Sequence, residues 1–213
     1  MIFVSHYDSP LGILYLAADK DGLKGVWFEG QKYFASGLKE NGTEEKETPV
    51  LKRTREWLDL YFAGKDPEFL PPLVPDGSEF RKEVWKLLLT IPYGKTMTYG
   101  EIGRKVAEMT GKKNMSAQAV GGAVGHNPIS ILIPCHRVVG TNGSLTGYAG
   151  GIEKKIGLLK LERTDMSVCS SFKSPIFFSI PPAYPVRLPF VPTTRWHGIR
   201  IEIGLWPTAP PTA

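Results

Sequence analysis

The distribution of prolines constrains the fold of this chain more than any other feature, because a proline interrupts the hydrogen bonds of a helix or a central strand. Four of the 18 prolines lie in residues 64–77, and half of them follow residue 165. Residues 166–213 also carry few charges and no hydrophobic period, so we expect an extended or disordered tail without a core of its own. The prolines therefore divide the chain into an N-terminal domain at 1–75, a second domain at 76–165 and the tail at 166–213.

Short apolar runs separated by turn residues predict a short antiparallel sheet in the N-terminal domain. The expected strands are Phe3–Tyr7, Gly12–Ala17 and Leu23–Phe28. Residues 31–46 are polar and charged and should form a loop or a short exposed helix. Pro49–Phe62 is predicted to be a helix, because an apolar stripe recurs along it at Leu51, Trp57, Leu58 and Tyr61. The fold class expected is α+β, with this small domain beside a mainly helical second domain.

Helical spacing of apolar residues dominates the second domain from Ser78 onward. Thr98 and Glu101 have the spacing of a capping box, in which each side chain satisfies a free backbone N–H of the other residue. They should open a helix that carries Ile102, Val106 and Met109 on one face. After a polar break, Ser116 can cap a short helix at Ala117–Val124 that consists almost wholly of small residues. Two short helices across a turn indicate a helix-turn-helix, although helical hairpins with no role in DNA binding are commoner.

Two further elements are expected around the only Cys-His pair of neighbours in the chain. Ile129–Ile133 should be a short buried strand that ends just before Pro134 and Cys135. Ile152–Glu162 should be the last helix, with its core face formed by Ile152, Ile156, Leu158 and Leu159.

The overall composition indicates an ordinary globular protein without a membrane span or a secretion signal. Of all residues, 42% are hydrophobic and 22% are charged, and the net charge of +5 suits a polyanionic partner without identifying one. No apolar run approaches about 20 residues, and the N-terminus lacks a signal-peptide pattern. Because Cys135 and Cys169 form no CxxC pair, we expect a reducing, cytoplasmic location, or a nuclear one in a eukaryote.

Cys135 and His136 are the candidates for chemistry. An imidazole can take the proton of a thiol and leave the nucleophilic thiolate, and a carboxylate can fix the imidazole in the required tautomer. Neighbouring side chains on a strand point to opposite faces, so contact between the two needs a bend or a bridging water. The alternative is an inert buried cysteine, which is commoner. The cysteines and histidines have no known metal-ligand spacing, so we expect no metal.

The longer sequence around Cys135 narrows these alternatives. Residues 121–140, GGAVGHNPISILIPCHRVVG, closely resemble the active-site signature of the O6-alkylguanine-DNA alkyltransferases, also called methylated-DNA–protein-cysteine methyltransferases. The resemblance continues through residues 147–151 and 158–162, and upstream it includes residues 99–102 and, more loosely, 9–12. It covers about residues 1–163.

The resemblance implies direct, single-turnover repair of DNA without a cofactor. Cys135 would accept the alkyl group from O6-alkylguanine, and O4-alkylthymine is a second candidate substrate. His136 would be the base that forms the thiolate through a water molecule, Glu162 would orient His136, and Arg137 would support the structure. A helix-turn-helix in the minor groove would present the flipped nucleotide to the site. The expected partner is double-stranded DNA containing O6-alkylguanine, bound by a monomer; cooperative binding is left open.

The resemblance also assigns residues around the flipped base. Tyr99 would turn its phosphate and donate a hydrogen bond toward guanine N3. Asn127 would tie the recognition helix to the active-site turn, and the carbonyl of Val138 would face the exocyclic amine. Tyr148 and Ala149 would cover the base, with the Ala149 N–H directed at O6.

Two positions depart from the usual pattern of this family. Gln118 stands where an arginine usually fills the space that the flipped base leaves, so we expect weaker assistance to flipping. Ser130 stands where some members carry proline, so we expect poorer stacking against bulky O6-benzyl groups. Related non-catalytic lesion sensors replace the acceptor cysteine, and related transcription regulators usually carry an additional domain; this chain has Cys135 and no sign of such a domain.

Overall fold

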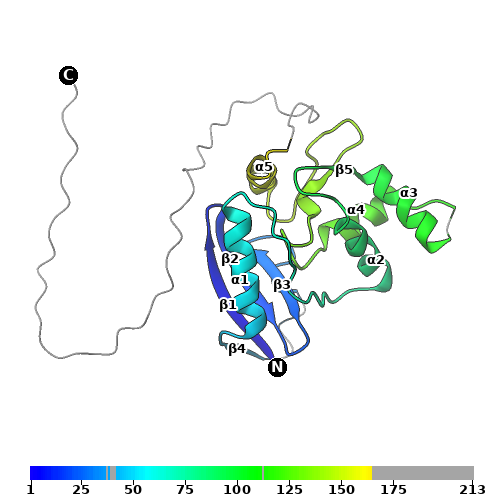
Figure 1. Ribbon diagram of the computed structural model, residues 1–213. Helices are drawn as coiled ribbons and strands as arrows, with labels where there is room; N and C mark the ends of the chain where they lie inside the picture. Colours follow the sequence, from blue (N-terminus) through cyan, green and yellow to red (C-terminus); the bar gives the residue numbers. More distant parts are fainter. Residues whose placement is uncertain (37, 39–41, 112, 165–213) are drawn as a thin grey trace, which may run out of the picture.

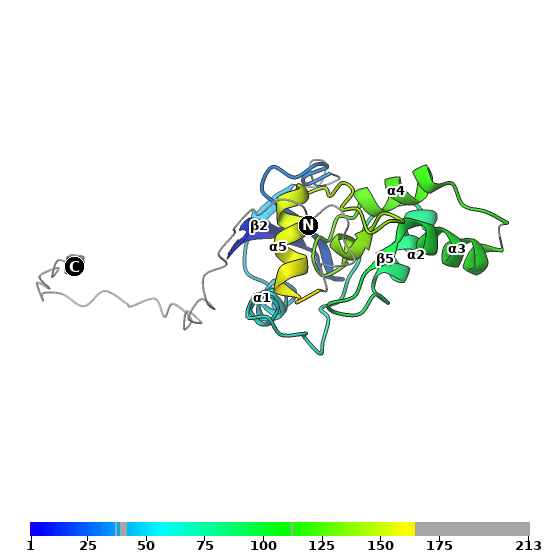
Figure 2. The same cartoon turned by 90° about the horizontal axis from the view of Figure 1, so that it is seen from above.

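The computed structural model describes residues 1–36, 38, 42–111 and 113–164. The sheet and the long helix that covers it form one side of the molecule, and the helices of the middle of the chain form the other side (Figures 1 and 2). The last helix lies on the side of the sheet, at one of its ends (Figure 1). The predicted tail at 166–213, and Cys169 within it, lie outside the described residues.

The N-terminal sheet has the predicted antiparallel core and one additional strand. Strands β1 (Ile2–Ser9), β2 (Gly12–Ala18) and β3 (Leu23–Phe28) pair antiparallel in the order β3-β2-β1. The short strand β4 (Thr43–Glu45) pairs parallel with β1, within the segment for which a loop or an exposed helix was expected. The alternation of β2 places Leu14 and Leu16 in the core.

Helix α1 has the predicted bounds, Pro49–Phe62, because both of its ends carry local signals. The hydroxyl of Thr48 accepts a hydrogen bond from the Leu51 N–H, and a proline occupies the first turn. The predicted apolar stripe of α1 is buried, together with Thr54. This stripe faces the sheet, and its last member, Tyr61, reaches the second domain.

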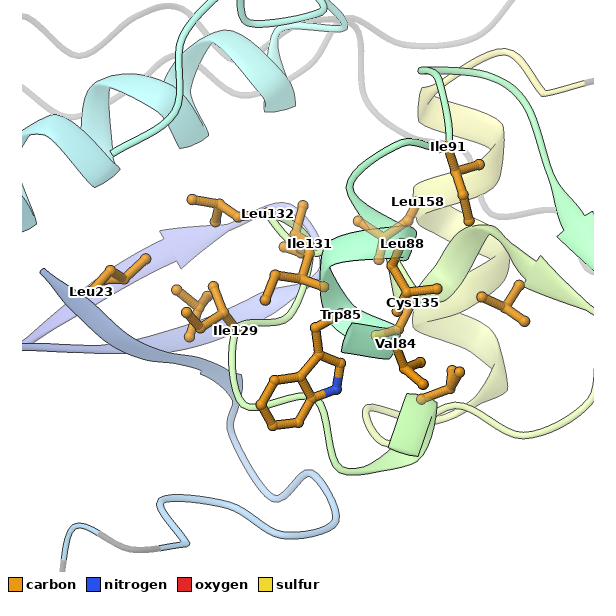
Figure 3. Close-up of a cluster of buried hydrophobic side chains, with 14 of the residues drawn as sticks. Leu23, Val84, Trp85, Leu88, Ile91, Ile129, Ile131, Leu132, Cys135 and Leu158 are labelled. Atoms are coloured by element: carbon orange, nitrogen blue, oxygen red, sulfur yellow. The ribbon is translucent and has the colours of Figure 1, made fainter. Parts of the chain in front are cut away.

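A continuous hydrophobic core joins the sheet to the helices. Helix α2 (Glu79–Leu88) starts at Ser78, whose hydroxyl caps it. The indole of Trp85 donates a 2.8 Å hydrogen bond to the Ala123 carbonyl of helix α4. Figure 3 shows the core between these elements: the labelled side chains run from Leu23 in the sheet, past Trp85, to Leu158 in the last helix.

The predicted helix-turn-helix is present as helices α3 (Tyr99–Thr110) and α4 (Ala117–Gly125). The capping box of Thr98 and Glu101 is confirmed, with both reciprocal hydrogen bonds formed. Of the predicted face, Ile102 and Val106 are buried, whereas Met109 is 55% exposed because the last turn of α3 extends beyond the core; Ala107 is buried as well. Ser116 precedes α4 but makes no side-chain cap.

The segment 129–133 is not the predicted strand. It makes one isolated bridge to β3, and Ile131 adopts a left-handed conformation with φ of 72°. The segment then continues into a one-turn 3₁₀ helix at Cys135–Arg137 and the short strand β6 (Val138–Val139), which pairs parallel with β5 (Met97–Thr98). Residues 129–133, four of which are apolar, are therefore buried as a compact turn rather than an extended strand.

The last helix, α5 (Ile152–Leu161), is rotated from the predicted orientation. Leu158 and Leu159 are buried as expected, but Ile156 is only partly buried and Ile152 is 39% exposed. The reason is Lys155, which is fully buried and donates hydrogen bonds to the carbonyls of Val138 and Thr146. A buried ammonium group needs hydrogen-bond acceptors, so the bonds of Lys155 to these two carbonyls determine which face of α5 is turned inward.

Candidate active site

Cys135 lies at the start of the 3₁₀ turn and is 5% exposed. Asn127, directly after α4, donates to the Cys135 sulfur at 3.0 Å and to the Ile133 carbonyl at 2.9 Å. Its amide oxygen accepts from the Ile129 N–H at 3.0 Å. The buried Asn127 side chain thus replaces the backbone partners that a neighbouring strand would supply. It also holds the Cys135 sulfur just after the turn formed by residues 129–133.

His136 is fully buried and paired with a carboxylate. Its Nε2 lies 2.6 Å from Oε1 of Glu162, whereas its Nδ1 is buried without a hydrogen-bond partner among the described residues. Burial lowers the pKa of His136, and Glu162 opposes this shift only in part. The imidazole is therefore neutral at neutral pH, with Nε2 as the donor and Nδ1 left as the basic nitrogen.

Glu162 is the centre of this network. Its Oε1 also accepts from the Tyr61 hydroxyl at 2.7 Å and from Nη2 of Arg137 at 3.0 Å. Its Oε2 accepts from Nε of Arg137 at 2.9 Å and from the Gly94 N–H at 3.1 Å. Burial alone would raise the pKa of the Glu162 carboxyl, but His136 and Arg137 together lower it to about 2. Because His136 is neutral at neutral pH, Arg137 supplies the charge that balances the carboxylate.

The Cys135 thiol is protonated in the resting protein. Burial raises its pKa, and the hydrogen bond from Asn127 and the positive charge of Lys155 oppose the increase without overcoming it. A thiolate therefore has to be formed at the moment of reaction, by transfer of the proton to a base. His136, the residue next to Cys135, is neutral and can accept a proton.

A cavity of about 300 Å³ opens at Cys135. It brings together predicted residues from distant parts of the chain: Tyr99, Cys135, Tyr148 and Ala149 all line it. The remaining wall is formed by one face of α4 and by His126 directly after it, by Gly147, and by Lys32 and Tyr33 after β3. Burial raises the pKa of the Tyr99 and Tyr148 hydroxyls, so both stay protonated as possible donors.

Val138, Ser130 and Gln118, which were predicted to contact the substrate or the DNA, do not line this cavity. Val138 is buried behind Cys135, with its carbonyl bonded to Lys155. Ser130 is also buried and donates to the Gln31 side chain at 3.2 Å. Gln118 is exposed on the first turn of α4, apart from the buried network.

Comparison with known proteins identifies the family. Residues 2–75 match the model of the 6-O-methylguanine DNA methyltransferase ribonuclease-like domain, and residues 79–164 match the model of the DNA binding domain of the same proteins. The chain belongs to the methylated-DNA–protein-cysteine methyltransferase family.

Individual relatives support this assignment over most of their length. The methylated-DNA–protein-cysteine methyltransferase of Methanosarcina acetivorans is 42% identical over 162 residues, which are 76% of this chain and 98% of the relative. That of Mycolicibacterium paratuberculosis is 46% identical over 165 residues, 76% of this chain and 93% of the relative. The crystal structure of Mycobacterium tuberculosis OGT in complex with DNA is 40% identical, with a TM-score of 0.65 over 76% of this chain and 92% of that chain.

Sequence reasoning missed several residues of the methyltransferase site. Lys155 could have been found, because it lies three and four positions before Leu158 and Leu159 and so shares their face of the helix. Tyr61 was expected only as a core residue of α1, and no signal in the sequence connects it to Glu162. Lys32 and Tyr33 were assigned to a polar loop, and nothing in their local pattern places them at a cavity.

Proposed function

We propose that this protein repairs DNA by transferring an alkyl group from O6 of a damaged guanine to the sulfur of Cys135, once per molecule. The observation that carries the proposal is the position of Cys135. Its thiol lies on the wall of a cavity that three tyrosines also line, and the next residue, His136, belongs to a buried pair with Glu162. Family membership agrees with this activity, since the relatives are named for the same transfer.

The site supplies each step of such a transfer. The Cys135 proton passes to His136, through its free Nδ1 and a water molecule, while Nε2 stays bonded to Glu162. The thiolate then attacks the alkyl carbon in line, so that the S–C bond forms as the C–O6 bond breaks. The electron pair of the broken bond stays on the guanine, and the Tyr99 hydroxyl donates toward the base to offset this charge.

The helix-turn-helix gives the cavity access to DNA. An O6-alkyl carbon cannot be reached inside the base stack, so the nucleotide has to leave the duplex. Helix α4 contributes Gly121, Gly122 and Gly125 to the cavity wall, where they leave room for a close approach of the DNA. Gln118 is exposed on the first turn of the same helix, and we expect it to contact the duplex beside the vacated position.

The remaining features of the proposal follow from this chemistry. The alkyl group is itself the transferred unit, so no cofactor or metal is required. A thioether is not hydrolysed, so each molecule acts once, as a monomer on double-stranded DNA. None of the helices within the described residues is long and apolar enough to cross a membrane. We place the protein where chromosomal DNA lies, in the cytoplasm or, in a eukaryotic cell, the nucleus.

Mass spectrometry after mixing with duplex DNA that carries one O6-methylguanine tests the proposal. We expect one added methyl group on the peptide that contains Cys135, and none on the Cys135→Ala variant. Tight binding of the lesion without a mass change would overturn the transferase function in favour of lesion sensing. A methyl group on another residue would overturn the assignment of Cys135.

A further inference from the structure

Part of the cavity wall comes from a segment outside the helix-turn-helix and the signature motif. Lys32 and Tyr33 follow β3, more than a hundred positions before Cys135 in the printed sequence, yet they line the same cavity. No role follows for them from the transfer chemistry, which is complete without them. Their position at the cavity therefore needs an explanation of its own.

The segment is tied to the rest of the site at three points. The Lys32 N–H donates to the Ala149 carbonyl at 2.9 Å. The Tyr33 ring stacks on the His126 ring at the end of α4, with centroids 3.9 Å apart and planes 23° from parallel. The buried side chain of Gln31 accepts from the Phe28 N–H and from the Ser130 hydroxyl. These contacts join the segment to both the 147–149 loop and α4, so it is a fixed part of the wall.

The backbone of this segment is held in an unfavourable conformation. Tyr33 has φ of 60° and Ala35 has φ of 49°, in the left-handed region that side chains other than glycine rarely adopt. Such strain costs roughly 1–3 kcal/mol per residue and tends to occur at functional sites. Packing of the Tyr33 side chain into the core does not explain this backbone conformation, because Tyr33 is 42% exposed. The conformation does place the Tyr33 ring against His126 at the cavity.

The Tyr33 ring is held by two neighbouring side chains. His126 covers one face, and the ammonium group of Lys32 lies over the ring at 5.5 Å from its centroid. The ring is therefore fixed in position by its stack on His126. It occupies space in a cavity whose volume, about 300 Å³, is at the lower end of the range for small-molecule sites.

We propose that Tyr33, held by its stack on His126, is a specificity-determining residue that limits the size of the O6-alkyl group the cavity accepts. The proposal rests on the proposed function, because it concerns the substrate range of the same site. It also assigns a structural consequence to Ser130: this residue affects the cavity through Gln31 and the segment 31–33, and not by touching the substrate.

Single-turnover rates on two DNA duplexes test the proposal, one carrying O6-methylguanine and the other O6-benzylguanine. Tyr33→Ala should raise the ratio of the benzyl rate to the methyl rate about tenfold or more, the discrimination that steric contacts in a pocket commonly provide. Tyr33→Phe keeps the ring and should keep the ratio within about twofold of that of the unaltered protein. The matched control is Phe34→Ala, because the neighbouring Phe34 ring packs on Tyr15 and Trp27 and does not line the cavity.

A second variant keeps the test independent of the folding of Tyr33→Ala. His126→Ala removes the support of the ring from the other side of the stack and also widens the cavity that His126 itself lines, so it should move the ratio in the same direction. An unchanged ratio in both variants overturns the proposal, and so does a lower ratio, which would mean that the ring assists bulky groups. If the unaltered protein transfers neither group, the proposed function itself has failed, which is a distinguishable result.

Discussion

The substitution Tyr61→Phe removes one hydroxyl group. The resulting change in Tm measures how much the contact between the N-terminal part of the chain and the proposed catalytic residues stabilises the protein. The Tyr61 side chain is fully buried, and its hydroxyl donates a 2.7 Å hydrogen bond to Glu162 while lying 3.4 Å from Nε2 of His136. Tyr61→Phe keeps the ring, which stacks on Trp57, and removes only this bond. The carboxylate then keeps its bonds to His136, Arg137 and Gly94.

The size of the effect follows from the charge on the acceptor. A hydrogen bond to a charged group contributes about 1.5–3 kcal/mol to stability. A chain of this length loses about 2–4 °C of Tm for each kcal/mol, so Tyr61→Phe should lower Tm by roughly 3–12 °C. The alkyl-transfer rate should fall less than about tenfold, because Arg137 and Gly94 still orient the carboxylate. His136→Ala, which removes the proposed base, should lower the rate by about 10²–10⁴-fold.

Thermal unfolding of Tyr61→Phe and Tyr7→Phe, side by side, provides the assay. Tyr7 is the matched control, because its hydroxyl also donates to a carboxylate, that of Asp59 at 2.8 Å, but at the protein surface. Water can replace that bond, so Tyr7→Phe should cost at most about 1 kcal/mol. Equal decreases in Tm for the two variants would refute the reasoning, since they would show that the Glu162 contact has no special weight.

Three further predictions concern other parts of the site. Asn127→Ala should lower the free energy of unfolding, measured in urea, by about 2 kcal/mol or more, because the buried Ile129 N–H loses its acceptor and the Ile133 carbonyl loses one of its donors; a smaller loss would mean that the backbone bonds of the turn are sufficient to hold it. Gln118→Arg should raise DNA affinity and repair rate, with a salt dependence steeper by about 0.9; no change in either would contradict the role given to Gln118. The stability should fall as the pH decreases below 6.5, because the unfolded chain then binds a proton on His136 that the folded protein, with its lowered pKa, does not. It should fall again from pH 4.5 toward about 2 as Glu162 is protonated. Tm measured from pH 8 to 5 should therefore decrease less for His136→Gln than for the unaltered protein.

The parts of the fold that the sequence predicted well are those with local causes. Helix α1 has a threonine cap, a proline in its first turn and an apolar stripe, and its bounds were predicted to the residue. The capping box at Thr98 is a second case, since both partners lie within one turn. The predicted antiparallel sheet also follows from patterns within each strand, whereas the three-residue strand β4 has no apolar pattern to predict it.

The parts that were predicted wrongly depend on a side chain that replaces the backbone. Residues 129–133 have the composition of a strand, but Asn127 takes up the Ile129 N–H and the Ile133 carbonyl, and Ile131 turns the chain. In α5, hydrophobic periodicity predicts that Lys155 is exposed to solvent. Its ammonium group is instead buried and donates hydrogen bonds to the carbonyls of Val138 and Thr146. Periodicity cannot detect either effect, because both depend on partners that the fold brings together.

The proposed site belongs to neither predicted domain alone, which explains why a motif confined to residues 99–162 described it incompletely. The Tyr61 hydroxyl of α1 bonds to the carboxylate that holds His136, and the Lys32 N–H bonds to the loop beside the cavity. The edge of β3 also holds the turn before Cys135, through backbone bonds between Val26 and residues 128 and 130. A buried cysteine with a raised pKa reacts only if the base that takes its proton and the alkyl group of the substrate both lie next to its sulfur. The N-terminal part therefore contributes to the chemistry by fixing these positions, although it contains none of the reacting atoms.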